Sequence, residues 1–216
     1  CYYCDFHFST NVKQIDQLIE AILIELKIQK LYLEAEKVDT IYLGGGTPSI
    51  LPIPDIEKIL VGVKHNYSIS DKPEITAEAN PDDLTEEKLK GLKALGINRL
   101  SIGIQSFQDE LLKFLNRAHD SSAAFKSYRL ARVLGFNNIS LDLIFSIPGQ
   151  SLSELEDDLV TVLDLHPEHI SIYGLTIEEK TVFGNWAKKK KFREVSDEDS
   201  ARQFNLIMNV LEGGGY

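Results

Sequence analysis

The spacing of apolar residues switches repeatedly between two periods along the chain. Apolar residues at every third or fourth position, the period of an amphipathic helix, mark the segments 11–33, 54–63, 85–96, 108–115, 121–134, 153–165 and 197–211. Short runs rich in β-branched and aromatic residues, which are typical of strands, occupy 40–43, 74–79, 99–104, 140–145 and 170–175. The pattern therefore predicts an opening helix followed by five strands that alternate with helices.

Several of the predicted helices carry start and stop signals. Thr85 precedes a helical segment as an N-cap, and Gly96 ends that segment. Ser153, with Glu156 three residues later, matches a capping box and predicts the start of the helix that runs to Leu165. These signals support the helix assignments independently of the apolar spacing.

The predicted strands combine parallel pairing with an unusual set of polar residues. Strands that alternate with helices of this length pair in parallel through crossover connections. In a flat sheet covered on both faces such strands would be almost wholly apolar. Here alternate strand positions are polar or small, and these positions are Thr76, Glu78, Ser101, Gly103, Gln105, Asp142, Ser171 and Tyr173. We therefore predict an α/β fold in which the strands form an incomplete barrel with a ligand inside it.

Composition and charge narrow the class of protein. Apolar residues make up 43% and charged residues 26% of the 216 residues, which suits one globular domain. The net charge of −10 argues against a general nucleic-acid-binding protein, because phosphate binding needs a basic face. The one basic run, 188–191, is followed by acidic residues and is interpreted as a solvated loop or helix end.

The chain gives no sequence sign of a membrane or secreted protein. No segment reaches the roughly 18 apolar residues that a transmembrane helix needs. Two cysteines in 216 residues do not make a disulfide framework of the kind found in small secreted proteins. A cytoplasmic location fits this composition best.

The two cysteines, Cys1 and Cys4, are three residues apart at the start of the chain. A C-x2-C pair occurs in redox dithiols, in zinc sites and in iron–sulfur sites. A thioredoxin-like dithiol would lie between a strand and a helix, and a zinc site would need a second pair of ligands. The spacing alone leaves an iron–sulfur site, zinc and chance as open alternatives.

A glycine-rich loop, Gly44-Gly45-Gly46-Thr47-Pro48-Ser49, follows the first predicted strand. Glycines let a backbone approach a ligand closely and offer unobstructed N–H donors. The loop lacks the Gly-Lys-Ser/Thr of a Walker loop and the G-x-G-x-x-G of a dinucleotide site. A ligand-binding loop and a simple tight turn remain the two interpretations.

Polar residues also gather where the predicted strands end. Glu78, Gln105 and Asp142 lie at or near the carboxyl ends of three strands, which is where α/β barrels place their sites. Arg117 follows the third strand and could pair with a carboxylate, since its planar guanidinium suits that partner. We expect these four side chains to converge on one rim.

At the level of motifs, the chain resembles radical S-adenosylmethionine proteins of the oxygen-independent coproporphyrinogen III oxidase-like family. The matching segments extend over the whole chain in order. They are Cys1-Tyr2-Tyr3-Cys4-Asp5-Phe6, the run from Tyr42 to Ser49, Glu78-Ala79-Asn80-Pro81, Arg99 to Phe107, Asn116-Arg117-Ala118-His119, Asp142 to Gln150, and His169 to Leu175. The resemblance implies an incomplete (β/α)6 barrel similar to a TIM barrel.

The resemblance gives the cysteine pair a specific role. The family's motif is C-x3-C-x2-C, so Cys1 and Cys4 correspond to its second and third cysteines. The first would lie four residues upstream, outside this chain. Three thiolates hold a [4Fe-4S] cluster and leave one iron open for S-adenosylmethionine. Residues 1–216 would then be the core domain, and we expect both the start of this domain and a C-terminal domain to lie outside the chain.

The resemblance also implies which residues surround S-adenosylmethionine. Tyr3 and the backbone near Gly174 would lie at the adenine, and Glu78 would bind the ribose or an amino group. Gly45, Gly46 and Thr47 would contact the methionyl end and a second S-adenosylmethionine site. Gln105, Arg117 and Asp142 would complete the pocket.

One position separates two branches of this family. Coproporphyrinogen oxidases carry a further cysteine two residues after the third one, where this chain has Phe6. Phe6 is similar to the heme chaperone branch, whose members bind heme and pass it to client proteins. We therefore expect a heme chaperone. The alternatives are an oxygen-independent coproporphyrinogen III oxidase, which would bind the porphyrinogen, and an α/β barrel without a cluster.

Overall fold

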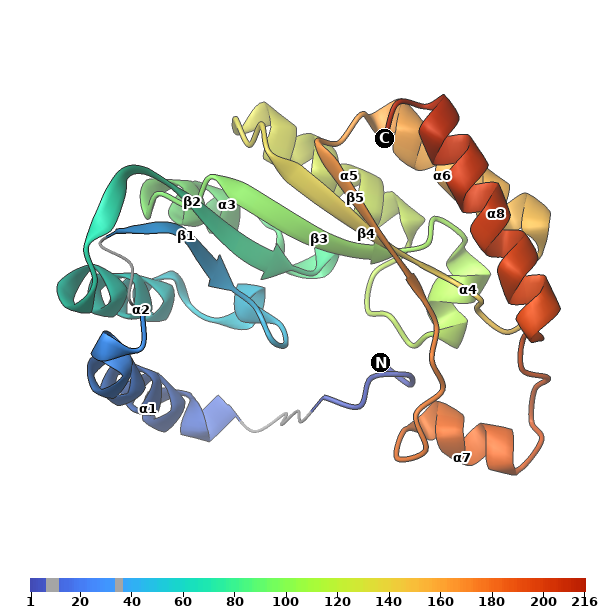
Figure 1. The fold of residues 1–216 in the computed structure, drawn as a ribbon, viewed down its shortest axis with the longest axis horizontal. Helices are drawn as coiled ribbons and strands as arrows, with labels where there is room; N and C mark the ends of the chain where they lie inside the picture. The colour runs from blue at the N-terminus through green and yellow to red at the C-terminus, as the bar shows by residue number, and fades with distance from the viewer. Residues whose placement is uncertain (7–11, 34–36) are drawn as a thin grey trace.

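A computed structural model of the chain describes residues 1–6, 12–33 and 37–216. Its centre is one parallel sheet with strands in sequence order, curled into a half-barrel (Figure 1). The strands are β1 (Val38–Leu43), β2 (Ile69–Ala79), β3 (Arg99–Gln105), β4 (Ile139–Phe145) and β5 (His169–Gly174). The helices are α1 (Ile15–Ile28), α2 (Ile53–Asn66), α3 (Glu86–Ala94), α4 (Asp109–Phe114), α5 (Ser121–Val133), α6 (Leu152–Leu165), α7 (Val182–Lys188) and α8 (Asp197–Gly213).

The register of the strands separates an apolar face from a polar one. Glu78 lies opposite Ser101 on the next strand, and Asp142 lies opposite Gly103 on one side and Ser171 on the other. Because side chains alternate across a strand, these residues share one face of the sheet. The prediction of an incomplete barrel with a polar interior is confirmed. The described residues supply five of the six strands that the family resemblance implied.

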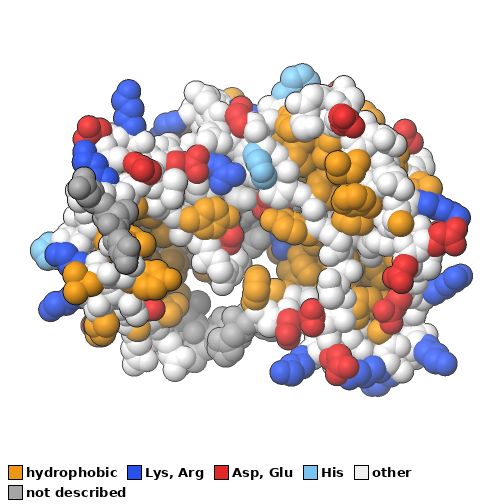
Figure 2. Space-filling model, in the orientation of Figure 1, with side chains coloured by type: hydrophobic (Ala, Val, Ile, Leu, Met, Phe, Trp, Pro, Cys, Tyr) orange, Lys and Arg blue, Asp and Glu red, His pale blue; other side chains and the backbone are white. Residues whose placement is uncertain are grey.

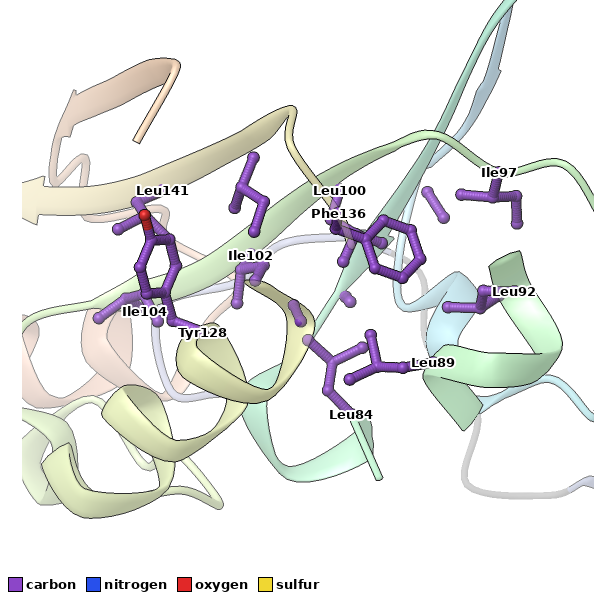
Figure 3. Packing of buried hydrophobic residues seen from close by; sticks show 14 of the residues in the cluster. Leu84, Leu89, Leu92, Ile97, Leu100, Ile102, Ile104, Tyr128, Phe136 and Leu141 are labelled. Carbon is purple, nitrogen blue, oxygen red and sulfur yellow. The ribbon is translucent and has the colours of Figure 1, made fainter. Parts of the chain in front are cut away.

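The hydrophobic core lies on the outer face of the half-barrel. Leu100, Ile102 and Ile104 of β3 are fully buried there, and so is Leu141 of β4. They pack against apolar side chains of α3 and α5 and of the segments that follow these helices, as Figure 3 shows. This packing fixes the outer face and leaves the inner face free to carry polar groups.

The start of α6 differs from its sequence-based prediction. The capping box is formed by Ser151 and Glu154, not by Ser153 and Glu156. The Ser151 side chain accepts from the Glu154 backbone N–H, and the Glu154 carboxylate accepts from the Ser151 N–H at 2.8 Å. Both pairs match the S-x-x-E spacing, and the extended backbone of Ser151 decides between them. The predicted N-cap Thr85 is confirmed, since its side chain accepts from the Lys88 N–H.

Three further boundaries differ from the predictions. The first helix is regular only over Ile15–Ile28 and has short 3-10 turns at Val12–Gln14 and Gln29–Leu31, and its predicted start at Asn11 lies outside the described residues. Strand β2 begins at Ile69, five residues before the predicted start. Helix α7 was not predicted, because its seven residues are too few to show a helical period.

Two observations concern the surface and the helices. The basic run 188–191 begins at the last residue of α7, and its side chains are exposed, as predicted. Within the described residues, no helix combines the length and the apolar character needed to span a membrane.

Candidate functional site

The candidate site lies where the strands of the half-barrel end. The N-terminal cysteine segment approaches this edge from below the sheet and runs close to α4 and α7 (Figure 1). Figure 2 shows the same face hollowed near its middle, below the strands. The strand ends and the cysteine segment therefore face a common open space.

The glycine loop after β1 is joined to Glu78 at the end of β2. The Gly45 N–H donates to the Glu78 carboxylate at 3.1 Å, and the Tyr42 hydroxyl donates to it at 2.9 Å. Burial and the neighbouring Glu78 carboxylate raise the pKa of Tyr42 to about 12, so its hydroxyl remains a donor at neutral pH. Gly44 has no room for a side chain, because a Cβ there would lie 2.6 Å from the Tyr42 ring. The loop is thus anchored on the side that faces Glu78, and its opposite side makes none of these contacts.

The outer side of this loop is open at Gly46. A Cβ added to Gly46 would meet no atom within 4 Å among the described residues. Gly45 has a φ of +88°, a conformation that favours glycine. The loop thus presents bare backbone to the hollow, which is the arrangement that a close-fitting anionic or polar ligand requires.

Arg117 connects the ends of β2 and β3 to the cysteine segment. Its Nη2 donates to the Asn80 Oδ1 at 2.7 Å and to the Gly103 carbonyl at 2.9 Å, and its Nη1 donates to the Cys1 Sγ at 3.2 Å. Its Nε is buried and has no partner among the described residues. An unpaired buried N–H is costly, so this guanidinium retains capacity for a further acceptor.

Gln105 ends β3 in an unusual conformation. Its φ is +71°, which is rare for a residue other than glycine. Its side chain folds back over Gly103, where an added Cβ would lie 2.7 Å from the Gln105 Nε2 and 3.4 Å from the Arg117 Nη2. Gly103 therefore leaves the space that the Gln105 and Arg117 side chains occupy.

Asp142 lies in the middle of β4 on the inner face. Its carboxylate accepts from the Ser101 hydroxyl at 3.0 Å and from the Ser140 hydroxyl at 3.3 Å. Burial raises the pKa of Asp142, and the serine hydroxyls oppose that rise by hydrogen bonding to the charged form. The group is thus a half-buried, hydrogen-bonded carboxylate near Glu78, whose charge also raises the Asp142 pKa.

The cysteine segment, Cys1–Cys4, carries two free thiols. Cys1 is exposed and Cys4 is half-buried, and neither forms a disulfide. Tyr3 lies beside Arg117, and burial raises the Tyr3 pKa, while the guanidinium and its hydrogen bond act in the opposite direction. Phe6, which distinguishes the two family branches, is 68% exposed.

The structure gathers several of the sequence-predicted site residues into two small groups at the strand ends and leaves two others at the margin. Glu78 is hydrogen-bonded to Gly45, and Arg117 contacts Cys1 and Tyr3. Thr47 precedes the turn Pro48–Ile50 and is half-buried. Gly174 ends β5 beside Phe145, on the far side of Asp142 from Arg117.

Two thiols and the polar rim fit part of a cluster site. Thiolates are the ligands that iron–sulfur clusters use. The described residues hold no group of three or more His, Cys, Asp or Glu side chains that could bind a metal ion. Within the described residues, Cys1 and Cys4 are the two free thiols that could contribute to such a site. The bare glycine loop and the orphaned Arg117 Nε suit the carboxylate and amine of an amino-acid-like ligand.

Three residues that build this site were not assigned roles from the sequence. Tyr42 and Asn80 lie within the recognised motifs, but only the structure shows that they hold Glu78 and Arg117. Asp158 of α6 is 1% exposed and accepts from the Ser106 hydroxyl at 2.6 Å and the Phe107 N–H at 2.9 Å. No sequence signal links Asp158 to a turn 50 residues away.

Comparisons with known proteins agree with this geometry. The heme chaperone HemW of Bacillus subtilis (strain 168) is 39% identical over all of this chain and 57% of its own length, and HemW of Escherichia coli (strain K12) is 38% identical over 86% of this chain and 50% of its own length. This chain thus spans about half the length of the curated relatives it matches.

Solved structures show the same fold. The coproporphyrinogen III oxidase HemN of Escherichia coli superposes on all of this chain with a TM-score of 0.85 at 26% identity, covering 50% of that protein. The methyltransferase TsrM of Kitasatospora setae, solved with cobalamin and a [4Fe-4S] cluster, covers 79% of this chain and 34% of its own with a TM-score of 0.58 at 16% identity. The profile of the radical SAM superfamily matches residues 1–162. This chain belongs to the radical SAM superfamily.

Proposed function

We propose that this chain is the cofactor-binding core of a heme chaperone, a protein that binds heme and transfers it to client proteins. The observation that carries the proposal is the match over all of this chain to heme chaperones at 39% and 36% identity. Phe6, in the position where an oxidase has a further cysteine, points the same way. Residues 1–216 would be one core domain of a longer cytoplasmic protein.

Membership of the superfamily implies a [4Fe-4S] cluster and S-adenosylmethionine. When bound, the cluster supplies one electron that cleaves a carbon–sulfur bond of S-adenosylmethionine. Cys1 and Cys4 would each bind one iron, and a cysteine upstream of this chain would bind a third. Arg117, which donates to the Cys1 Sγ, would place its positive charge beside that ligand.

The rim residues would bind S-adenosylmethionine. Gly45, Gly46 and Thr47 would contact its methionyl end through backbone groups, and Glu78 would accept from its amino group or ribose. The unpaired Arg117 Nε would donate to its carboxylate. The remaining contacts would come from Tyr3 and the backbone near Gly174 at the adenine, and from Gln105 and Asp142 in the pocket wall.

The experiment that tests heme transfer uses the full-length protein. Anaerobically reconstituted protein should bind heme with a stable Soret band and pass it to an apo client hemoprotein. When supplied with coproporphyrinogen III, S-adenosylmethionine and dithionite, it should form no protoporphyrinogen IX. Decarboxylation of coproporphyrinogen III would overturn the proposal and establish the oxidase alternative, to which the 0.85 TM-score with HemN draws attention.

A further inference from the structure

We infer that helix α7 is a positioning element for the cysteine segment, which it holds through an aromatic clamp formed by Tyr2, Phe183 and Trp186. The inference rests on the proposed cluster site, because it concerns where Cys1 and Cys4 are placed. It assigns a role to a helix that no motif in the sequence marks.

The main chain of Tyr2 is tied on both sides. Its N–H donates to the Leu115 carbonyl at 3.1 Å, and its carbonyl accepts from the Phe183 N–H at 3.0 Å. Leu115 follows α4 and Phe183 lies in the first turn of α7, so the residue after Cys1 bridges two elements that are 68 residues apart (183 − 115). Both backbone hydrogen-bonding groups of Tyr2 are therefore used to locate the segment.

The side chains repeat this connection. The Tyr2 ring lies edge-on to the Trp186 ring at 5.1 Å and 6.2 Å from the Phe183 ring, measured between centroids. Phe183 is fully buried and also contacts the rings of Phe114 at 4.7 Å and Phe192 at 5.7 Å. Aromatic pairs at these separations are favourable beyond the area that they bury. Phe183 is thus the centre of a cluster that holds Tyr2 at its edge.

Helix α7 is itself closely fixed. The Thr181 hydroxyl donates to the Glu178 carbonyl at 2.7 Å and accepts from the Gly184 N–H at 3.0 Å. A Cβ added to Gly184 would lie 2.2 Å from the Glu178 carbonyl oxygen, so the helix packs directly against the backbone before it. Because α7 has no room to shift along this contact, the position of Phe183 determines the position of Tyr2.

The clamp sets the distance between the thiols and the strand-end rim. Tyr2 lies between Cys1, whose Sγ contacts Arg117, and Tyr3, which lies beside the same guanidinium. Residues 1–4 form no helix or strand, so their position depends on contacts with other elements. Partners that orient metal ligands from outside typically change metal affinity 10- to 100-fold when they are removed. The aromatic clamp is the outer support of this kind.

The test uses full-length protein reconstituted anaerobically with iron and sulfide. Tyr2→Ala removes the aromatic ring that the cysteine segment contributes to the clamp and leaves α7 intact. Phe183→Ala removes the ring at the centre of the aromatic cluster. We expect both variants to lose iron to a chelator at about 10- to 100-fold lower chelator concentration than the wild type. The reduced cluster should also show a changed EPR spectrum and midpoint potential, which a general loss of stability would not produce.

Two matched variants complete the experiment. Phe204→Ala removes the same side chain from an exposed position of α8 and should leave the cluster unchanged. Phe183→Leu retains an apolar side chain and should recover most of the iron retention.

The outcomes separate this inference from the proposed function. Wild-type protein that holds no cluster would overturn the proposed cofactor site. Wild-type protein that holds a cluster, together with a Tyr2→Ala variant of equal iron retention, EPR spectrum and potential, would overturn the clamp alone. If Phe183→Ala does not fold, Tyr2→Ala still decides the question, because the Tyr2 ring lies at the edge of the aromatic cluster.

Discussion

The strand-end rim and the cysteine segment face the same hollow, yet they are held in different ways. Glu78, Gln105 and Asp142 belong to strands whose register fixes their neighbours and whose outer face packs on a dry core. The cysteine segment has no regular structure and is held by two backbone hydrogen bonds and a small aromatic cluster. The difference indicates that one half of the site is set by the sheet and the other by a remote helix.

The largest expected effect is on stability and comes from removing a core side chain behind the strand-end rim. Ile102 is fully buried between β3 and the outer helices, so Ile102→Ala should lower the free energy of unfolding by about 2–5 kcal/mol. Chemical denaturation measures this change. Val133→Ala, at a position of α5 that is 82% exposed, is the matched control and should change stability by less than about 0.5 kcal/mol. An equal cost for both would contradict the assignment of the core to the outer face.

A smaller effect is expected where a helix supports the rim. Asp158 of α6 accepts from Ser106, Phe107 and the Gln108 side chain, directly after Gln105. Asp158→Ala leaves the Ser106 hydroxyl and the Phe107 N–H without this acceptor, which should cost on the order of 1–3 kcal/mol, and frees the turn that holds the φ of Gln105. We expect reduced stability together with weaker S-adenosylmethionine binding by calorimetry. The exposed neighbour Asp157 provides the control, since Asp157→Ala should change neither quantity.

The glycine loop offers a change that should affect the ligand without affecting the fold. A side chain at Gly46 would project into open space, so Gly46→Val should leave the unfolding midpoint nearly unchanged and weaken S-adenosylmethionine binding about tenfold or more, an energy of roughly 1.4 kcal/mol. Calorimetry on the reconstituted full-length protein measures the affinity. Unchanged affinity would remove this loop from the site.

The smallest effect is a pH dependence that separates ligand binding from stability. Burial raises the pKa of Asp142, so its carboxylate takes up a proton above the ordinary value of about 3.9. As pH falls through the raised pKa, S-adenosylmethionine affinity should decrease if the charged form accepts from the ligand.

Stability should move in the opposite direction over the same pH range. A raised pKa in the folded state means that the folded protein binds the proton more tightly than the unfolded chain, so protonation stabilises it. The wild type should therefore gain stability on acidification relative to Asp142→Asn. Calorimetry and unfolding curves of both proteins from neutral pH downward measure the two trends. If affinity and stability changed with pH in the same way in the wild type and in Asp142→Asn, Asp142 would be excluded as the group responsible.

The sequence predicts the sheet side of the site far better than the cysteine side. Alternation of polar and apolar residues identifies the inner face, because each strand such as Leu100 to Gln105 has a regular period of two. The expectation that Glu78, Gln105 and Arg117 lie on one rim came from their positions at or after the ends of strands. The capping-box prediction was wrong only in choosing Ser153 over Ser151, since both serines match the same spacing.

The remaining features depend on contacts between distant residues. Phe183 and Tyr2 are far apart in sequence and are brought together by the tertiary fold. Asp158 and Phe107 are 51 residues apart, and nothing local to either residue predicts their pairing. A helix of seven residues has too few turns for a periodic signal. Tertiary packing, not local propensity, determines these parts of the structure.

The most direct test of the central claim asks whether the cysteine segment and the rim act as one site. The full-length protein, reconstituted and reduced anaerobically, should show a [4Fe-4S] EPR signal that changes when S-adenosylmethionine is added. The Glu78→Gln variant, which keeps both cysteines and alters only the rim, should show the signal but a much weaker response to the ligand. A full response in Glu78→Gln, or an unchanged wild-type signal on addition of S-adenosylmethionine, would contradict the account.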